Sequence, residues 1–278
     1  MVIFGGNVRI GVLGGIGPEA TGEFYLKLIR GLQETGLIKD NRDYPQIFIN
    51  SIPAPELVGK SISYEQLRPY VAGLRELERL EVDSIVMVCN TIHLYHSEFQ
   101  TGIRLPIINL RQKVKERILR DGIEKITVLG TPSTIRNELY RFDGINYIDL
   151  SEQDIEILSS AIFKYNKGEN RDLQKQTVES IARKYLAIGA DVILLACTEP
   201  AVMLKNVDIP KIDTLDVLVD GVIDFYKKQL PIARERLFPK YNPSDLVRRI
   251  KTDKEFREGR ERNITGCFEN PIFLMEDD

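Results

Sequence analysis

Two cysteines directly follow two strongly apolar segments of this chain. Residues 84–88 (SIVMV) lead into Cys89, and residues 192–196 (VILLA) lead into Cys197. Apolar runs of this length are typical of parallel strands that are buried on both faces. Open α/β sheets bind their ligands beyond the carboxyl ends of such strands. The sequence therefore predicts that both thiols lie at a ligand-binding site.

A pair of thiols suits the removal and return of a proton on carbon. A proton next to a carboxylate is hard to remove, so an enzyme needs a base within hydrogen-bond reach and donors that stabilise the resulting anion. Inverting the carbon centre also needs an acid on the opposite face. Cys89 and Cys197, one as thiolate and one as thiol, are expected to fill these roles and to exchange them with the direction of reaction.

Polar residues that follow each cysteine are candidates for holding the substrate and the thiolate. Asn90, Thr91 and Thr198 offer hydrogen-bond donors, which a thiolate needs for its stability. Glu199 and the two histidines, His93 and His96, are candidates for assisting proton movement. His93 is equally a candidate for contacting the site residues without touching the ligand. For Glu199, capping of its own helix N-terminus is an equally good interpretation.

Other interpretations of the cysteines stay open at this point. A single cysteine at a strand end is usually a small apolar residue, but its recurrence at two equivalent positions favours chemistry. Cys89, His93 and Cys197 together would supply three ligands for catalytic zinc; we expect no metal, because no second Cys/His pair is present. A disulfide between the two cysteines is disfavoured in a reducing compartment. Cys267 and His96 have no comparable setting.

A glycine-rich segment follows an earlier apolar strand at residues 9–13. It reads GGIGP, and a helical stripe of apolar residues comes after it. We expect Gly15, Ile16 and Gly17 to form a loop at a helix N-terminus that binds an anionic group. The alternative is a tight turn that needs glycine for its backbone alone. A dinucleotide fingerprint is matched only in part, because Ala20 takes the place of its third glycine.

Landmarks of the first half of the chain return in the second half. Three pairs recur in the same order, offset by 104 to 116 positions: Gly14 and Gly130, Cys89 and Cys197, Pro106 and Pro210. This recurrence indicates an internal duplication. We expect an α/β fold of two pseudo-symmetric domains, each a parallel sheet flanked by helices, with the active site in the cleft between them.

The expected domain boundaries follow from this repeat. Residues 1–110 form the first α/β domain, with residues 215–229 packing back onto it, and residues 111–214 form the second. Residues 230–278, rich in charge, are expected to be a C-terminal extension that packs on the body or on a second subunit. Smaller expected elements are a strand at 105–110 and helices at 134–142 and 217–229.

Composition excludes several classes of protein. The 278 residues include 38 Lys and Arg against 41 Asp and Glu, whereas nucleic-acid-binding proteins usually carry a basic surplus. No apolar stretch approaches the roughly 20 residues that cross a bilayer. The first residues lack the pattern of a signal peptide, and three cysteines make no disulfide framework. We expect a cytoplasmic protein whose partner is a small molecule.

Three motifs in this order resemble those of the aspartate/glutamate racemase family, which works without pyridoxal phosphate. They are GGIGP from Gly14, CNTIH from Cys89 and ACTE from Ala196. The similarity spans about residues 8–229. It is greatest to the aspartate racemase branch, where the first motif is usually GGMGP, so Ile16 replaces a methionine.

The resemblance implies two α/β domains, a homodimer, no cofactor, and catalysis by Cys89 and Cys197. It further implies a set of residues that bind the substrate carboxylates and ammonium: Gly15, Ile16, Gly17, Asn90, Thr91, Thr131, Thr198 and, for the side-chain carboxylate, Lys167. One departure concerns the loop at residues 52–57, where the family often has an arginine for the distal carboxylate. Here this loop has no arginine, and the nearest basic residue is Lys60.

The predicted function is cofactor-independent racemisation of an amino acid, aspartate first, with glutamate or a broader set of amino acids next. A related alternative is cis–trans isomerisation of an unsaturated diacid such as maleate, in which one cysteine adds to the double bond. Decarboxylation of a disubstituted malonate is a less favoured alternative, because that chemistry needs only one of the two thiols. A two-lobed protein that binds a small molecule without chemistry is the alternative from another class.

Overall fold

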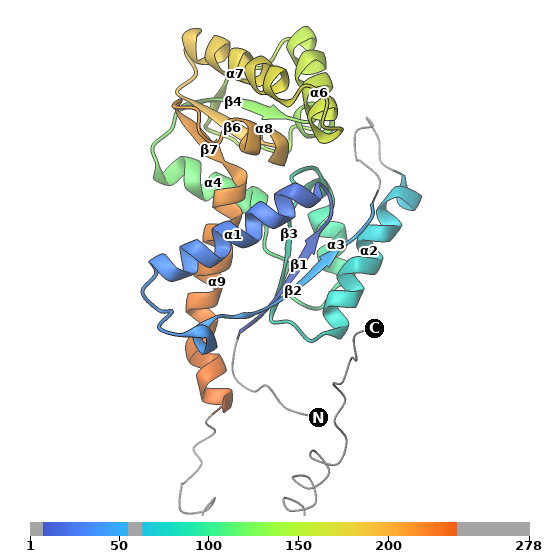
Figure 1. Cartoon of the computed structure of the whole chain (residues 1–278), viewed down its shortest axis with the longest axis vertical. Coiled ribbons are helices and arrows are strands. Elements are labelled where there is room, and N and C mark those ends of the chain that lie inside the picture. The colour runs from blue at the N-terminus through green and yellow to red at the C-terminus, as the bar shows by residue number, and fades with distance from the viewer. Residues whose placement is uncertain (1–7, 55–62, 238–278) are drawn as a thin grey trace, which may run out of the picture. The chain divides into compact units, whose positions relative to one another are not determined.

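Two parallel sheets organise the part of the chain that the computed structural model describes, residues 8–54 and 63–237 (Figure 1). Residues 7–231 form one compact unit. Of the second unit, residues 1–6 and 232–278, only the helical segment 232–237 is described. Lys60, Cys267 and nearly all of the predicted extension lie outside the described residues.

The first sheet has the strand order β2-β1-β3, and all its pairings are parallel. Its strands are β1 (Arg9–Gly14), β2 (Gln46–Ser51) and β3 (Ser84–Met87). The helical segments in this half are α1 (Pro18–Glu34), η1 (Asn41–Asp43), α2 (Tyr64–Arg79), η2 (Thr91–Tyr95) and α3 (His96–Gly102). Figure 1 shows α1 on one side of the sheet and α2 on the other. All four residues of β3 are fully buried, as expected of a strand covered on both faces.

The second sheet has the order β5-β4-β6-β7 and is also parallel. Its strands are β4 (Lys125–Gly130), β5 (Asn146–Tyr147), β6 (Val192–Ala196) and β7 (Lys211–Asp213). The helices are α4 (Leu110–Arg120), α5 (Pro132–Arg136), α6 (Glu152–Asn166), α7 (Arg171–Ala187), α8 (Thr198–Met203) and α9 (Thr214–Leu237). Leu158 of α6 and Val178 of α7 join Ile193 and Leu195 of β6 in one buried apolar cluster. The predicted α/β class, with parallel sheets flanked by helices, is confirmed.

The two sheets place their glycine and cysteine segments in the same way. In the first, Leu13 of β1, which precedes Gly14, lies opposite Met87 of β3, two residues before Cys89. In the second, Gly130 of β4 lies opposite Ala196 of β6, just before Cys197. Each cysteine therefore follows a strand that neighbours the glycine-terminated strand of its own sheet.

Local sequence signals account for several helix ends. The Ser63 side chain accepts a hydrogen bond from the Gln66 amide, and the Gln66 side chain accepts one from the Ser63 amide, which is a capping box at the start of α2. Ser151 caps α6 in a similar way by accepting from the Asp154 amide. Gly168, at φ 76°, follows the end of α6 in the left-handed conformation that glycine tolerates.

Three predicted elements differ from the structure. The strand predicted at 105–110 is reduced to one bridge between Ile85 and Ile107, since Pro106 offers no amide to a ladder. The helix predicted at 134–142 is α5, which starts and ends earlier because Thr131 caps it and Glu138 has a φ of 52°. The helix predicted at 217–229 continues to 237 as α9, through a proline that interrupts its hydrogen bonding.

Lys27 of α1 is paired with two carboxylates from β7 and α9. Its Nζ lies 2.6 Å from Asp213 and 2.6 Å from Asp216, and the Lys27 and Asp213 side chains are only 18% and 10% exposed. Close packing accompanies the pair, since a Cβ added at Gly31 would lie 2.6 Å from Ile223 of α9. These contacts join α9 to α1, while the boundaries of the domains stay a prediction.

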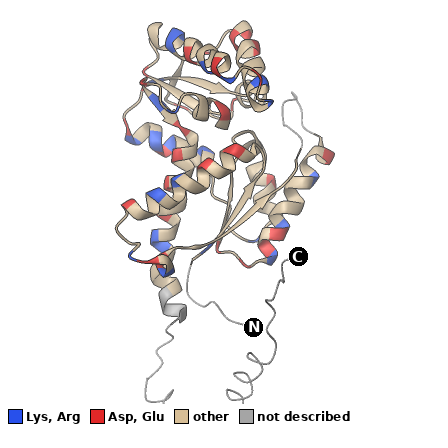
Figure 2. Ribbon diagram, viewed as in Figure 1, with Lys and Arg blue, Asp and Glu red and all other residues tan. Residues whose placement is uncertain are grey.

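Figure 2 shows Lys and Arg interspersed with Asp and Glu along the described helices. None of the described helices combines the length and apolar character that a bilayer span requires.

Replacing Lys27 by methionine should destabilise the protein. Removal of one partner from a largely buried ion pair leaves the other charge without compensation, and we expect a loss of about 3 kcal/mol in the free energy of unfolding. Urea unfolding measures this loss. The matched control is Lys205→Met, which breaks a more exposed pair with Glu23 and should cost about 0–1 kcal/mol. Equal losses in both variants would contradict the structural role of Lys27.

Candidate active site

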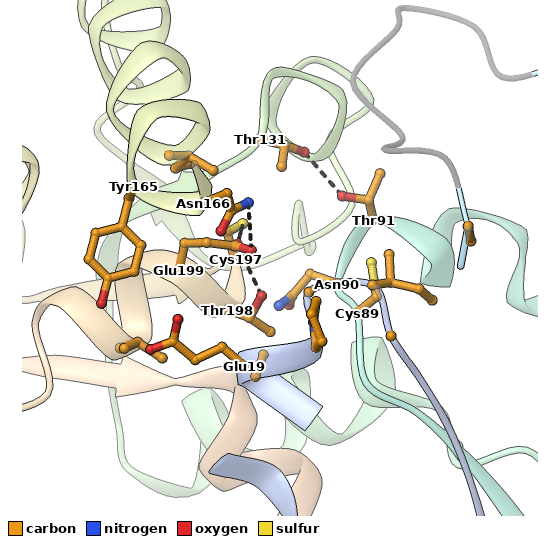
Figure 3. A pocket seen from close by; sticks show the side chains of 18 residues that line it. Glu19, Cys89, Asn90, Thr91, Thr131, Tyr165, Asn166, Cys197, Thr198 and Glu199 are labelled. Carbon is orange, nitrogen blue, oxygen red and sulfur yellow. Dashed lines mark hydrogen bonds between the residues drawn. The ribbon is translucent and has the colours of Figure 1, made fainter. Parts of the chain in front are cut away.

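A cavity of about 340 Å³ lies at the carboxyl ends of the strands of both sheets, and both Cys89 and Cys197 line it (Figure 3). Its volume is in the range that proteins use for small-molecule ligands. The cavity is lined by every predicted site residue except Lys167: Gly15, Ile16, Gly17, Cys89, Asn90, Thr91, Thr131, Cys197, Thr198 and Glu199. The first six come from the half with β1 and β3, and the other four from the half with β4 and β6.

Lys167 does not line the cavity. It is exposed just beyond the end of α6, and its Nζ lies 4.2 Å from the centre of the Phe163 ring. The preceding residue, Asn166, does line the cavity and donates from Nδ2 to Glu199 Oε1 at 3.2 Å. The binding of a side-chain carboxylate by Lys167 thus has no support in this geometry.

Cys197 and Glu199 form a hydrogen-bonded pair inside the cavity. The Cys197 Sγ donates to Glu199 Oε2 at 2.8 Å, and Thr198 Oγ1 donates to the same oxygen at 3.0 Å. Cys197 is 6% exposed. Burial, together with the neighbouring carboxylate, raises the pKa of Cys197 well above the ordinary thiol value.

Cys89 has a different setting, half-buried at the opposite wall. Burial raises its pKa to about 11, and the charge of Glu199 adds to this effect. Hydrogen bonds with the amides of Ile92 and Thr91 act in the other direction and favour the thiolate. Near pH 7 both thiols are therefore protonated, and a cation placed between them would favour ionisation of one.

Asn90 is held in one orientation by a buried tyrosine. Tyr140 Oη donates to Asn90 Oδ1 at 2.5 Å. Because the oxygen of the amide is engaged, the Nδ2 group is the part left to donate, and Figure 3 shows it on the cavity side. Burial raises the pKa of Tyr140 well above its ordinary value, so it stays a donor.

Three threonine hydroxyls connect the segments that follow β3 in the first sheet and β4 in the second. Thr91 Oγ1 lies 3.1 Å from Thr131 Oγ1 and 3.0 Å from Thr134 Oγ1. Thr131 also caps α5 by accepting from the Thr134 amide. Thr91 and Thr131 line the cavity from opposite halves of the fold, and this hydroxyl cluster fixes their separation.

The glycine loop is shaped by close approach as well as by its place at a helix N-terminus. Gly15 has a φ of 90°, and an added Cβ would lie 2.3 Å from the Ile52 carbonyl oxygen. Gly17 has a φ of 33°, and its added Cβ would lie 3.0 Å from Glu199 Oε1. The Gly15 amide donates to Thr21 Oγ1 at 3.0 Å. This amide is therefore engaged within the loop, and the binding of an anionic group by the rest of the loop stays a prediction.

The two histidines do not line the cavity. His93 is buried, its Nε2 lies 3.3 Å from the Met87 carbonyl oxygen, and burial lowers its pKa to about 3. His96 Nε2 lies 3.0 Å from the Ile107 carbonyl oxygen. Within residues 8–54 and 63–237 no group of three Cys, His, Asp or Glu is arranged to hold a metal ion. The zinc alternative of Cys89, His93 and Cys197 is thus not formed here.

Several lining residues were missed by the sequence analysis: Pro18, Glu19, Ala20, Ala54, Ile162, Tyr165, Asn166 and Val202. Glu19 directly follows the GGIGP motif, which is a usable signal. Ile162, Tyr165 and Asn166 have the i, i+3, i+4 spacing of one helix face, but nothing in the sequence indicates that this face meets the cavity.

Comparison with known proteins gives one consistent result. The sequence model of a protein family described as Asp/Glu/hydantoin racemase matches residues 13–222. The broad specificity amino-acid racemase RacX of Bacillus subtilis is 30% identical over 227 residues, which cover 78% of this chain and 97% of that protein.

Solved structures show the same fold. An aspartate racemase homologue from Pyrococcus horikoshii OT3 is 26% identical, with a TM-score of 0.63 over 79% of this chain and 99% of that one. The aspartate racemase of Picrophilus torridus is 23% identical, with a TM-score of 0.65 over 81% of this chain and 99% of that one.

Replacing Tyr140 by phenylalanine should weaken substrate binding, because Asn90 loses the hydrogen bond that fixes its amide. One neutral hydrogen bond contributes about 1 kcal/mol, which corresponds to roughly a fivefold rise in KM. Steady-state kinetics on any amino acid that is turned over measures the change. Tyr25→Phe, at an exposed position on α1, is the control, and an equal change there would contradict the role of Tyr140.

Replacing Glu199 by glutamine should lower the pKa of Cys197. The carboxylate charge and the hydrogen bond from the thiol both favour the neutral thiol, so their removal is expected to move the titration of Cys197 to lower pH. The rate of iodoacetamide alkylation at Cys197, followed by mass spectrometry across pH, measures this shift. Glu98→Gln, on the exposed side of α3, should leave the profile in place. An upward shift in Glu199→Gln would contradict the assigned interaction.

Proposed function

Because the chain belongs to the Asp/Glu/hydantoin racemase family, we propose that it racemises an α-amino acid by moving the α-proton between Cys89 and Cys197. Family membership makes the protein an isomerase of amino acids. The observation that carries the two-thiol scheme is that both cysteines, at equivalent strand ends, line one cavity of substrate size.

The proposed step removes one proton from the α-carbon and adds one proton to the opposite face of the same carbon. The thiolate of one cysteine takes the α-proton, an S–H bond forms, and the C–H electron pair passes into the carboxylate system. The thiol of the other cysteine then gives its proton to the opposite face of the planar carbon, and its S–H electron pair stays on sulfur. The products are the mirror-image amino acid and an enzyme in which the two cysteines have exchanged states.

The surrounding residues supply what this step needs. The Asn90 amide, oriented by Tyr140, and the Thr91 hydroxyl are suited to the α-carboxylate, where negative charge develops. The single O–H of Thr198, which donates to Glu199 in the empty cavity, can turn to the same carboxylate when the α-ammonium takes its place at Glu199. Glu199 is suited to the α-ammonium. An ammonium beside Glu199 offsets the negative charge that raises the pKa of both thiols, so substrate binding promotes formation of the thiolate.

Aspartate is the first substrate to test, since the motifs resemble the aspartate racemase branch most and one similar structure is an aspartate racemase. Glutamate comes next. The similarity to a broad specificity racemase supports a panel of amino acids rather than a single one. The homodimer, the independence from pyridoxal phosphate and the cytoplasmic location belong to this proposal as predictions.

Serine at either cysteine should abolish racemisation. Each single replacement removes one of the two proton-transfer groups, so we expect a loss of about 10²–10⁴-fold in kcat. In heavy water each variant should still exchange the α-proton of one enantiomer, and the two variants should differ in which one. Chiral chromatography and proton NMR measure the two outcomes.

Cys267→Ser is the control and should racemise as the unaltered protein does. Full racemisation by Cys89→Ser or Cys197→Ser would contradict the two-thiol scheme. Conversion of maleate to fumarate, without α-proton exchange on any amino acid, would favour the isomerase alternative. Ligand binding that survives both replacements, with no turnover in the unaltered protein, would favour a binding protein.

A further inference from the structure

The charged groups that line the cavity are acidic. Among the lining residues that the structure describes, Glu19 and Glu199 carry charge, and none is lysine or arginine. The remaining described lining residues are neutral. A dicarboxylic amino acid carries a second carboxylate that its α-ammonium does not offset, and the described lining residues include no cation to pair with it. The charge of the described part of the cavity wall therefore disfavours a dicarboxylic substrate.

Glu199 is committed to the reacting end of the substrate. Its hydrogen-bond partners Cys197, Thr198 and Asn166 are all neutral, and it lies against the thiol. An α-ammonium next to the reacting carbon is the cation that this position suits. Glu19 is left as the second carboxylate, available to the substrate side chain.

Glu19 lies at the rim of the cavity, in the first turn of α1. Its Oε2 accepts from Arg171 at 2.7 Å, and the Arg171 guanidinium lies 4.4 Å from the centre of the Tyr165 ring. The two charged side chains are 53% and 43% exposed. Exposed ion pairs of this kind contribute little to stability, so a second cation can share or replace Arg171 at Glu19 at low cost.

An apolar wall runs beside this carboxylate. Ile162 and Tyr165 of α6 and Val202 of α8 line the cavity. Figure 3 shows Glu19 and Tyr165 on the same side of the cavity, away from Cys89. The charge of Glu19 also contributes to the raised pKa of Tyr165, which places the two groups close together. Methylene groups can pack on such a wall while a terminal cation meets the carboxylate.

We propose that Glu19 selects substrates whose side chain is a short methylene chain ending in a cation, such as lysine or ornithine. This inference rests on the proposed racemisation and assigns the substrate class of the same cavity. Glu19 acts by contact with the side-chain ammonium and takes no part in proton transfer. Arg171 remains over Tyr165 and holds Glu19 in place when the cavity is empty of a cation.

The test compares three amino acids on the full-length protein: L-lysine, its uncharged analogue L-norleucine, and L-aspartate. The unaltered protein should show a kcat/KM for lysine at least about tenfold above that for aspartate. In Glu19→Gln the ratio of kcat/KM for lysine to that for norleucine should fall about tenfold, the effect of losing about 1.4 kcal/mol of differential binding. Glu23→Gln, one turn along α1 and paired with Lys205, should keep the original ratio.

A preference for aspartate in the unaltered protein would overturn the inference, as would an unchanged lysine-to-norleucine ratio in Glu19→Gln. Arg171→Gln separates a further case. If Arg171 turned inward to bind a distal carboxylate, this variant would lose aspartate turnover selectively, and that loss would also overturn the inference. Absence of α-proton exchange with every amino acid would instead remove the proposed function itself.

Discussion

The burial of both thiols away from bulk water is the constraint on which the rest of the site depends. A desolvated thiol holds its proton tightly, as the raised pKa values of Cys89 and Cys197 show. The fold then places groups of opposite effect on the two sulfurs. Backbone amides at the start of η2 favour the thiolate of Cys89, while Glu199 favours the neutral form of Cys197. A substrate that carries its own ammonium shifts this balance, so the charge of the ligand becomes part of the catalytic site.

The parallel sheets explain why such a site forms at all. Each cysteine follows a strand whose neighbour ends in glycine, and the same arrangement occurs twice. Carboxyl ends of parallel strands leave backbone and side-chain groups unpaired at one edge. Two such edges, connected through the hydroxyls of Thr91, Thr131 and Thr134, enclose a cavity that neither sheet makes alone.

The fold, and the residues that line the cavity next to each motif, could be predicted from local patterns in the sequence. Cys89, Cys197 and the polar residues next to them could be found because apolar runs end abruptly at these positions. Tyr140 and Tyr165 could not, since each reaches the site from a segment without a recognisable signal, and only tertiary packing brings it there. The prediction of Lys167 as a binding residue shows how a one-residue offset is lost in the sequence: Asn166, the last residue of α6, lines the cavity, while the next side chain lies on the Phe163 ring.

The unequal surroundings of the two thiols have a kinetic consequence under the proposed reaction. Mirror-image amino acids have the same free energy in water, so the equilibrium constant of racemisation is fixed at unity whatever the protein does. The ratio kcat/KM must then be identical for the two enantiomers. The carboxylate at Cys197 and the amides at Cys89 can therefore express their difference only as a trade between kcat and KM, with one enantiomer bound more tightly and turned over more slowly than its mirror image.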